Sequence, residues 1–592
     1  MTSEEPARFD VVIVGGGLAG LSLARQLLLA TRRTVLLLER LPELPPKRQK
    51  VGESTVQLAG YYFSRVLELE EHLMNCHYLK YNLRFYWPSA GRSNQGFEDV
   101  SQGFIRDISN VASYQVDRNV LEGELFRLCS ADPRFRAVLG ASVGDVELGA
   151  GGADHRLRFS TAEGPQEVRA GWVVDATGRN RLFAKRRQLQ RPSPIRHGTY
   201  FWWVEGLIDI EKLSSRSGRE RRLDPSRRTL GHLPSWLATN HFVGEGFWFW
   251  VIPLHGKTSL GLVYDRAVVD LEEINKPEKA SEWVIERFPL LARELRHRKV
   301  LDASGYRGYA YDCGETLSAE RWAMTGEAGR FTDPLYSPGS DLIAIYNTLI
   351  VDAIETEDAD ELAAKARSYE QLERAVYGAY MPSYLYSYDV LGDPEAFFLK
   401  YTWELAVYFV FYVFPFINDL FTDRRFIASH LRAFSRLGPI NHGLQKLLSA
   451  YYQWKKPRIG LPEEPIYFDF NDLGPLARAR TTFYQIGIEV EEARKVLAEQ
   501  LENLDELARF LYARIASVVL DEPRVLESAA FVAGIDPAAL RFDPEEMARR
   551  WEAARLGPER HRWSFDPAII ERFPTRRLPA AATSREEVEV LP

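Results

Sequence analysis

"FDVVIVGGGLAGLSLARQLLLATRRTVLLLER", residues 9–40, decides the fold that we predict for this chain. Residues 11–14 form a continuous apolar run, which is typical of a buried parallel strand. A helical pattern covers residues 21–29, and a second apolar run at residues 35–38 predicts another strand. Strand, helix and strand in this order form a βαβ unit, so the sequence predicts an α/β fold of the Rossmann type.

Three glycines join the first predicted strand to the helix. Gly15, Gly17 and Gly20 form a G-x-G-x-x-G motif, and Glu39 ends the second strand. Glycines let backbone N–H groups approach a pyrophosphate at a helix N-terminus, and the acidic residue is placed to bind a ribose hydroxyl. The motif therefore predicts a dinucleotide site, which suits FAD and NAD equally.

Later segments favour FAD. Residues 172–175 predict a strand that leads into Ala-Thr-Gly-Arg, a second glycine turn far from the first. The turn at residues 337–340 precedes a long helix, whose N-terminus would offer N–H donors to an electron-rich flavin edge. One long ligand held at several points fits this pattern, although Ser54 could simply cap a helix. We assign to cofactor binding Gly15, Gly17, Gly20, Glu39, Glu53, Ser54, Arg118, Asp333 and Gly339.

Composition excludes several classes of protein. At 592 residues the chain is too long for one core, so we expect two or three domains. A net charge of −7 without a strong basic run argues against nucleic acid as the main partner. Three cysteines without C-x-x-C spacing exclude a disulfide framework and a cysteine zinc site, and we expect no metal. Reduced cysteines and an acidic start without a signal-peptide pattern predict a cytoplasmic protein.

Six segments together resemble the flavin-dependent halogenases, which have the group-A flavin monooxygenase fold. They are "GGGLAG", "VGEST", "YLKYNLRFYW", "VVDATGR", "WFWVIP" and "FTDPLYSPG". The fifth, Trp248 to Pro253, matches the family signature W-x-W-x-I-P without a mismatch, and the resemblance covers residues 8 to about 380. It implies an FAD-binding Rossmann-type core.

The resemblance also implies a reaction. A separate flavin reductase would supply FADH2, since the chain shows no second nucleotide motif for NAD(P)H. With O2 this gives a flavin hydroperoxide, which chloride or bromide attacks to form hypohalous acid. Lys80 stands in the position of the family's catalytic lysine and would polarise the acid as an ammonium or carry the halogen as a haloamine. The alternative is a surface lysine at a strand start.

Two further sets of residues take roles from the resemblance. Trp248 and Trp250, with Ile252 and Pro253 fixing their strand, would separate the flavin compartment from the substrate. The alternative is that these tryptophans are strand core. The turn Pro338, Gly339 and Ser340 would lie beside the halide.

One departure from the family bears on the substrate. The enzymes that act on free tryptophan carry a glutamate in the loop that here reads "DPLYSPG", and Tyr336 stands at that place. Without this carboxylate we expect an electron-rich aromatic substrate such as a phenol or a pyrrole, either free, lipophilic or bound to a carrier protein. Glu53 is an acidic residue that could substitute, without an assigned role.

The C-terminal third lacks the glycine turns and strand patterns of the preceding part and is rich in aromatic residues. We predict a core at residues 1–384, including a substrate-facing sheet, and a mostly helical domain at residues 385–592 that forms a lid. The apolar run 405–417 is too short to span a bilayer, and we expect no membrane association. It predicts a buried helix ended by Pro415, or the wall of an apolar pocket. Another helix should start at Asp543-Pro544, and the tail from about residue 575 should fray. The rings expected to pack on the core or the substrate include Trp403, Tyr408, Phe411 and Tyr412.

Two other functions stay open at this point. A flavin monooxygenase or dehydrogenase on the same fold would need substrate access to the flavin. A non-catalytic flavoprotein would bind a partner protein through its C-terminal helices and would tolerate the loss of Lys80. Product analysis with and without halide separates these from a halogenase.

Overall fold

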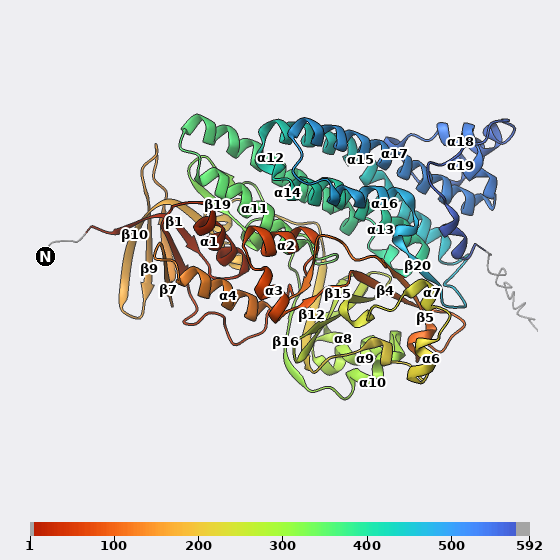
Figure 1. Cartoon of the computed structure of the whole chain (residues 1–592), viewed down its shortest axis with the longest axis horizontal. Coiled ribbons are helices and arrows are strands. Elements are labelled where there is room, and N and C mark those ends of the chain that lie inside the picture. The colour runs from red at the N-terminus through yellow and green to blue at the C-terminus, as the bar shows by residue number, and fades with distance from the viewer. Residues whose placement is uncertain (1–4, 576–592) are drawn as a thin grey trace, which may run out of the picture.

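The computed structural model describes residues 5–575, which form two eight-stranded sheets, two small two-stranded sheets and a layer of long helices. The first sheet holds the N-terminal strands, and the second lies beside it with several short helices on its outer side (Figure 1). Long helices from the second half of the chain run along one side of both sheets (Figure 1). The residues predicted to form the tail lie outside the described part, except for residue 575.

The predicted βαβ unit is confirmed at the centre of the first sheet. Strand β1 (Ala7–Val14) lies between β2 (Val35–Glu39) and β10 (Gly164–Asp175), and all three are parallel. Helix α1 (Leu18–Ala30) connects β1 to β2. The sheet order is β18-β19-β10-β1-β2-β7, with β9 and β8 continuing antiparallel from β10. The other strands are β7 (Phe135–Leu139), β8 (Ser142–Glu147), β9 (His155–Thr161), β18 (Leu317–Ser318) and β19 (Trp322–Met324).

The second sheet carries the W-x-W-x-I-P segment in its interior. Its order is β16-β12-β15-β14-β13-β4-β5-β20. Every residue of β14 (Phe247–Leu254) is buried, and side chains alternate between two cores, with Trp248 and Trp250 on the side of the long helices. Its other strands are β4 (Leu83–Pro88), β5 (Val100–Phe104), β12 (His197–Glu205), β13 (Thr239–Gly244), β15 (Lys257–Asp265), β16 (Val300–Tyr306) and β20 (Tyr467–Asp469).

Helices fill the rest of the chain. Beside the first sheet and the turn at residues 337–340 lie α2 (Gln57–Tyr61), α3 (Glu70–Cys76), α4 (Arg118–Ser130) and α11 (Pro338–Ile354). On the outer side of the second sheet lie α8 (Leu271–Ile274), α9 (Pro277–Arg287) and α10 (Ala292–Leu295). The helical layer contains α12 (Ala359–Leu385), α13 (Pro394–Tyr408), α14 (Phe414–Ile417), α15 (Arg424–Lys455), α16 (Gly474–Arg480), α17 (Val490–Leu520) and α19 (Pro544–Ala554). The predicted helix start at Asp543-Pro544 is thereby confirmed.

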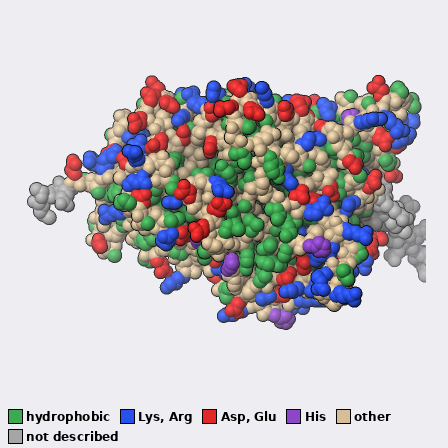
Figure 2. Space-filling view, in the orientation of Figure 1, with side chains coloured by type: hydrophobic (Ala, Val, Ile, Leu, Met, Phe, Trp, Pro, Cys, Tyr) green, Lys and Arg blue, Asp and Glu red, His purple; other side chains and the backbone are tan. Residues whose placement is uncertain are grey.

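The apolar helix of the C-terminal third is longer than predicted. It runs through Pro394–Ile417, and a π-helical turn at Phe409–Val413 joins α13 to α14. The prediction that Pro415 ends this helix was wrong, because Pro415 sits in the first turn of α14, where a missing N–H costs little. By length and apolar content the helix could cross a membrane, yet 94% of its apolar window is buried inside the structure. Charged side chains lie along the outer edge of the helical layer (Figure 2).

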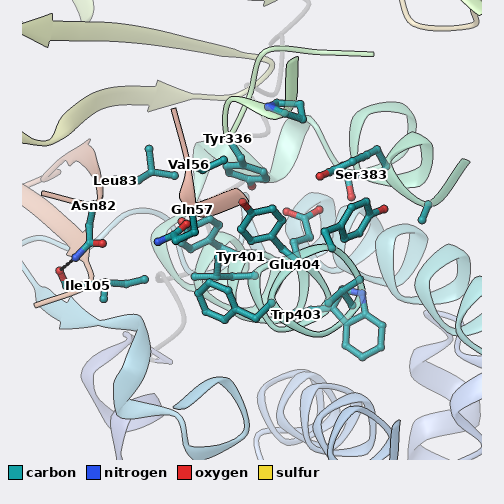
Figure 3. A pocket seen from close by; sticks show the side chains of 18 of the residues that line it. Val56, Gln57, Asn82, Leu83, Ile105, Tyr336, Ser383, Tyr401, Trp403 and Glu404 are labelled. Carbon is teal, nitrogen blue, oxygen red and sulfur yellow. Dashed lines mark hydrogen bonds between the residues drawn. The ribbon is translucent and has the colours of Figure 1, made fainter. Parts of the chain in front are cut away.

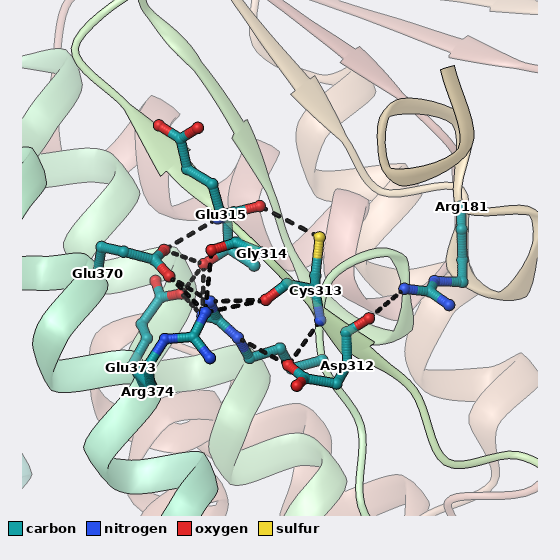
Figure 4. Close-up of polar contacts among 10 residues, drawn as sticks. Arg181, Asp312, Cys313, Gly314, Glu315, Glu370, Glu373 and Arg374 are labelled. Carbon is teal, nitrogen blue, oxygen red and sulfur yellow. Dashed lines mark hydrogen bonds and ion pairs between the residues drawn. The ribbon is translucent and has the colours of Figure 1, made fainter. Parts of the chain in front are cut away.

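Direct contacts fasten the helical layer to the two sheets. The indole of Trp87 donates to the carbonyl of Leu391 at 2.9 Å, and β20 pairs with β5. Buried Arg330, which follows β19, pairs with Glu370 and Glu373 of α12, and Figure 4 shows these carboxylates converging from the helix on the segment around Cys313. The predicted boundary at residue 384 falls at the end of α12. The division into two domains stays a prediction.

Candidate active site

The glycine turn after β1 is closely packed on one side and open on the other. A Cβ at Gly15, whose φ is +116°, would lie 2.3 Å from the Ala176 carbonyl oxygen, and one at Gly20 would lie 2.0 Å from the Gly15 oxygen. A Cβ at Gly17 would meet nothing within 4 Å. Gly17 is the N-cap residue of α1, and because it is a glycine no side chain caps the first-turn amides. The open N-terminus of α1 is therefore suited to an anion such as a pyrophosphate.

Glu39 lies at the end of β2, beside this turn, as predicted. Its Oε2 accepts a hydrogen bond from the Gly16 amide at 2.6 Å, and Oε1 accepts one from the Leu41 amide at 2.9 Å. The carboxylate thus ties the glycine turn to the segment after β2.

A cavity lies between the first sheet and the tryptophan face of β14, and we call it the tryptophan cavity. Eight predicted site residues line it: Glu53, Ser54, Arg118, Trp248, Trp250, Ile252, Gly339 and Ser340. Pro253 is buried in the same strand, opposite Thr258. His241, which stacks on Phe85 at 4.8 Å, and Tyr306 line the cavity too and were not predicted.

The turn before α11 brings a helix N-terminus to this cavity. Tyr336 and Ser337 both have left-handed backbone, with φ of 68° and 62°. Such conformations cost about 1–3 kcal/mol each in residues other than glycine, and they cluster at functional sites. Ser337 caps α11 without a side-chain hydrogen bond, so the first-turn amides next to Gly339 and Ser340 have no side-chain cap. The positive end of α11 therefore favours an anion or electron-rich edge in the cavity.

The Glu53 side chain is fixed at the wall of the tryptophan cavity. The indole of Trp203 donates to Glu53 Oε1 at 2.6 Å, and burial raises the pKa of Glu53 to about 8. Burial therefore favours the neutral form of this side chain near neutral pH. Glu53 does not line the cavity that contains Lys80, and its suggested substitution for the loop glutamate stays a prediction.

Asp333 lines neither the tryptophan cavity nor the cavity that contains Lys80. Its Oδ2 accepts hydrogen bonds from the Tyr309 hydroxyl and from His197 Nδ1, each at 2.7 Å. The hydroxyl of Tyr388 lies 3.4 Å from Oδ1 and accepts from the indole of Trp248 at 2.6 Å. Asp333 therefore positions the loop and the tryptophan strand through neighbours, and its predicted contact with a cofactor stays a prediction.

Lys80 lies in a second cavity, which we call the lysine cavity. It follows α3 and precedes β4, as predicted, and is only 4% exposed, so the surface-lysine interpretation was wrong. Its Nζ donates to Ser54 Oγ at 2.8 Å and to the Thr55 carbonyl at 2.7 Å. Burial lowers the pKa of the Lys80 ammonium to about 7, so proton loss is accessible near neutral pH.

Several aromatic rings from the helical layer line the lysine cavity (Figure 3). They are Tyr380, Tyr384, Tyr401, Trp403, Tyr408, Phe409 and Tyr412, joined by Tyr336 from the turn before α11. The predicted packing on the core is confirmed for Tyr408, whose hydroxyl accepts from the Leu58 amide at 3.2 Å, while Trp403 and Tyr412 line the cavity. Phe411 packs instead within the helical layer, against Phe434 at a ring-centroid distance of 4.9 Å, so the prediction that it packs on the core or the substrate was wrong.

The two cavities meet at a thin partition. Ser54 lines the tryptophan cavity, and its hydroxyl bonds to Lys80, which lines the lysine cavity. At the start of α11, Gly339 lines the tryptophan cavity and Pro338 lines the lysine cavity. Lys80 can therefore reach a small species that passes the partition, while a ring in the lysine cavity stays apart from the tryptophan cavity.

Comparison with curated proteins gives this arrangement a context. No protein-family profile matches the chain. The chain is 26% identical over 398 residues to the flavin-dependent halogenase chlA of Dictyostelium discoideum, and 25% identical over 397 residues to tetracycline 7-halogenase of Kitasatospora aureofaciens. Each alignment covers 62% of this chain, and they span 64% and 67% of the two relatives. This chain is related to the flavin-dependent halogenases.

Solved halogenase structures share the fold. Halogenase PltM superimposes with a TM-score of 0.57 at 15% identity, covering 84% of this chain and 96% of PltM. The chondrochloren halogenase CndH gives 0.51 at 22% identity, covering 64% and 81%. The α/β architecture with a helical C-terminal region is thus that of the FAD-dependent halogenases.

The sequence analysis did not identify one charged residue of the candidate site. Glu404 of α13 lines the lysine cavity (Figure 3). A signal was present, because Glu404 is the only charged residue between positions 401 and 417. A lone carboxylate in such an apolar helix needs a partner or a function.

Proposed function

We propose that this chain is a flavin-dependent halogenase that chlorinates or brominates an electron-rich aromatic compound. The observation that carries the proposal is the position of Lys80. This buried lysine bonds to Ser54 at the partition and lines a cavity of aromatic rings on the other side. Its relation to named halogenases supports the same reaction class.

The residues on the first sheet fit FAD. The open face of Gly17 and the N-terminus of α1 would receive the pyrophosphate, and Glu39 would meet the adenosine ribose. The tryptophan cavity would receive the flavin ring against the N-terminus of α11. When bound in reduced form, with O2 and a halide, FAD supplies hypohalous acid. We propose a separate flavin reductase as the source of reduced flavin.

The chain's own residues then direct the halogen. The N-terminus of α11 would favour a halide near Gly339 and Ser340. Trp248 and Trp250 would keep the aromatic substrate out of the tryptophan cavity, since their rings are buried and fixed. Lys80 would bind the hypohalous acid at the partition and present the halogen to the ring in the lysine cavity.

The substrate that we propose is phenol-like or pyrrole-like. A cavity lined by aromatic rings together with a few placed polar groups suits a flat ring that carries a polar substituent. One solved structure of PltM is a complex with phloroglucinol and FAD, and a relative 23% identical to this chain is a pyrrole-2-carbonyl carrier-protein chlorinase of Pseudomonas fluorescens. A free phenol and a carrier-bound ring are both within this proposal. We propose a cytoplasmic location.

Supplying FADH2, O2 and bromide tests the proposed function before the substrate is known. Trapping with monochlorodimedone should report hypohalous acid that depends on bromide. A panel of phenols and pyrroles should then give brominated products. Hydroxylated products that form equally well without halide would favour the monooxygenase alternative.

Replacing Gly17 by valine should weaken FAD binding without disturbing the fold. The added side chain enters open space in the protein and occupies the place of the pyrophosphate. We expect the Kd for FAD to rise by about tenfold or more, a loss of about 1.4 kcal/mol. Fluorescence titration with FAD measures this change.

Gly20→Val is the matched control. Its Cβ would lie 2.0 Å from the Gly15 oxygen, so this variant should lose thermal stability whether or not flavin is present. If Gly17→Val binds FAD as tightly as the unaltered protein, the assigned pyrophosphate site is wrong.

A further inference from the structure

Glu404 lines the lysine cavity and carries one carboxylate oxygen that is buried and unpaired among the described residues. Its side chain is 9% exposed, and it comes from α13, the helix that supplies several of the aromatic rings (Figure 3). Oε1 accepts hydrogen bonds from Lys400 Nζ at 2.6 Å and from Gln445 Nε2 at 3.0 Å. Within residues 5–575, Oε2 has no partner at hydrogen-bonding distance.

The groups behind Glu404 fix it in place. Lys400 is fully buried and also donates to Ser387 Oγ at 2.8 Å and to the Ser383 carbonyl at 3.1 Å. The cation therefore has enough partners, and Glu404 cannot turn away without breaking a buried ion pair, which costs several kcal/mol. This anchoring leaves Oε2 without a donor in normal hydrogen-bond geometry among residues 5–575.

An unpaired carboxylate oxygen at this depth calls for a donor from a ligand. Burying a polar atom without a partner costs about 1–3 kcal/mol, and more for a charged group. Tyr336 and Tyr401 line the same cavity as Glu404, and the centroids of their two rings lie 5.0 Å apart. The Tyr336 hydroxyl is a further protein donor directed toward this carboxylate, and the two groups do not reach normal hydrogen-bond geometry. The site thus offers ring contacts and one anionic acceptor, which match the face and the hydroxyl of a phenol.

We propose that Glu404 binds the hydroxyl of a phenolic substrate and accepts its proton while the ring takes the halogen from Lys80. The inference rests on the proposed halogenase function and narrows its substrate class to phenols. Glu404 of α13 would thereby supply the carboxylate that the loop around Tyr336 lacks.

Proton transfers at Lys80 and at Glu404 accompany the proposed halogenation. The ring carbon forms a bond to the halogen, and the halogen–oxygen bond of the hypohalous acid breaks. The leaving oxygen takes a proton from the Lys80 ammonium and departs as water. The phenolic O–H electrons form a carbonyl as the proton passes to Glu404 Oε2. The ring carbon then returns its proton to Lys80, Glu404 returns the other proton to oxygen, and the halogenated phenol forms.

Glu404→Gln tests this assignment with paired substrates, a phenol and its O-methyl ether. We expect kcat/KM for phenol bromination to fall about a hundredfold, the scale of one general base, while bromination of the ether changes less than about threefold. The variant should also bind the phenol more weakly in calorimetry and leave binding of the ether unchanged. Monochlorodimedone trapping should give the same rate of hypohalous acid formation as in the unaltered protein.

A second variant guards against a folding defect. Lys400→Met combined with Glu404→Gln removes both charges of the buried pair at similar volume, so it should fold and show the same loss of phenol preference. Equal losses for phenol and ether, or retained phenol bromination, would overturn the role of Glu404. Absence of hypohalous acid from the unaltered protein would instead refute the proposed function, and the phenol-binding difference would still test Glu404.

Discussion

Replacing Lys80 by alanine should abolish halogenated product while flavin oxidation and hypohalous acid formation continue nearly unchanged. Lys80 lines the lysine cavity, whereas the residues that fit the flavin ring lie on the other side of the partition. Without its Nζ, nothing at the partition holds the halogen near the ring. A loss of about 4 kcal/mol in the transition state corresponds to a rate drop of about a thousandfold. Product analysis by mass spectrometry and trapping of hypohalous acid measure the two steps separately.

The fold should survive this change. Lys80 makes its two hydrogen bonds to Ser54 and the Thr55 carbonyl, which are uncharged partners. Lys80→Met keeps most of the side-chain volume and controls for packing, so it should match the alanine variant in product loss. An alanine variant that still halogenates substrate at a comparable rate would refute the assignment.

The parts of the site predicted from sequence are those that local patterns specify. The turn from β1 to α1 follows from glycines that cannot carry a Cβ at positions 15 and 20. Lys80 could be found because a short segment around it resembles the family. The tryptophans of β14 could be found for the same reason, and their alternation between two cores follows from strand geometry.

The lysine cavity could not be predicted, because it is assembled from segments far apart in the chain. It combines residues near Lys80, the turn at Tyr336 and helices α12 and α13. Helical spacing in an apolar segment does not tell which rings face a cavity and which face neighbouring helices, so Phe411 and Tyr412 looked equivalent. The π-helical turn that carries the helix past Pro415 depends on packing as well, and it shifts the facing residues.

Deleting residues 385–592 should leave a chain that does not fold. The core rings of β4 pack directly on the deleted part: Phe85 lies 4.6 Å from Phe397 and 5.1 Å from Tyr401 between ring centroids, and Trp87 donates to the Leu391 carbonyl. Exposing each large apolar side chain costs about 1.5–3 kcal/mol, and a protein's net stability is about 5–15 kcal/mol. Loss of a few such contacts therefore exceeds the stability available. Soluble expression and near-UV circular dichroism of the truncated chain test this expectation.

Two single substitutions separate the packing role of the helical layer from its role in the lysine cavity. Phe411 is fully buried against Phe434, away from the cavity, so Phe411→Ala should cost about 3–5 kcal/mol of stability and leave the choice of substrate unchanged. Tyr401 lines the cavity and contacts Tyr336, so Tyr401→Leu should change the relative rates among phenols. Thermal denaturation and competition between two phenols measure these effects. A truncated chain that is soluble, binds flavin and keeps its substrate range would show that the helical layer is neither core nor lid.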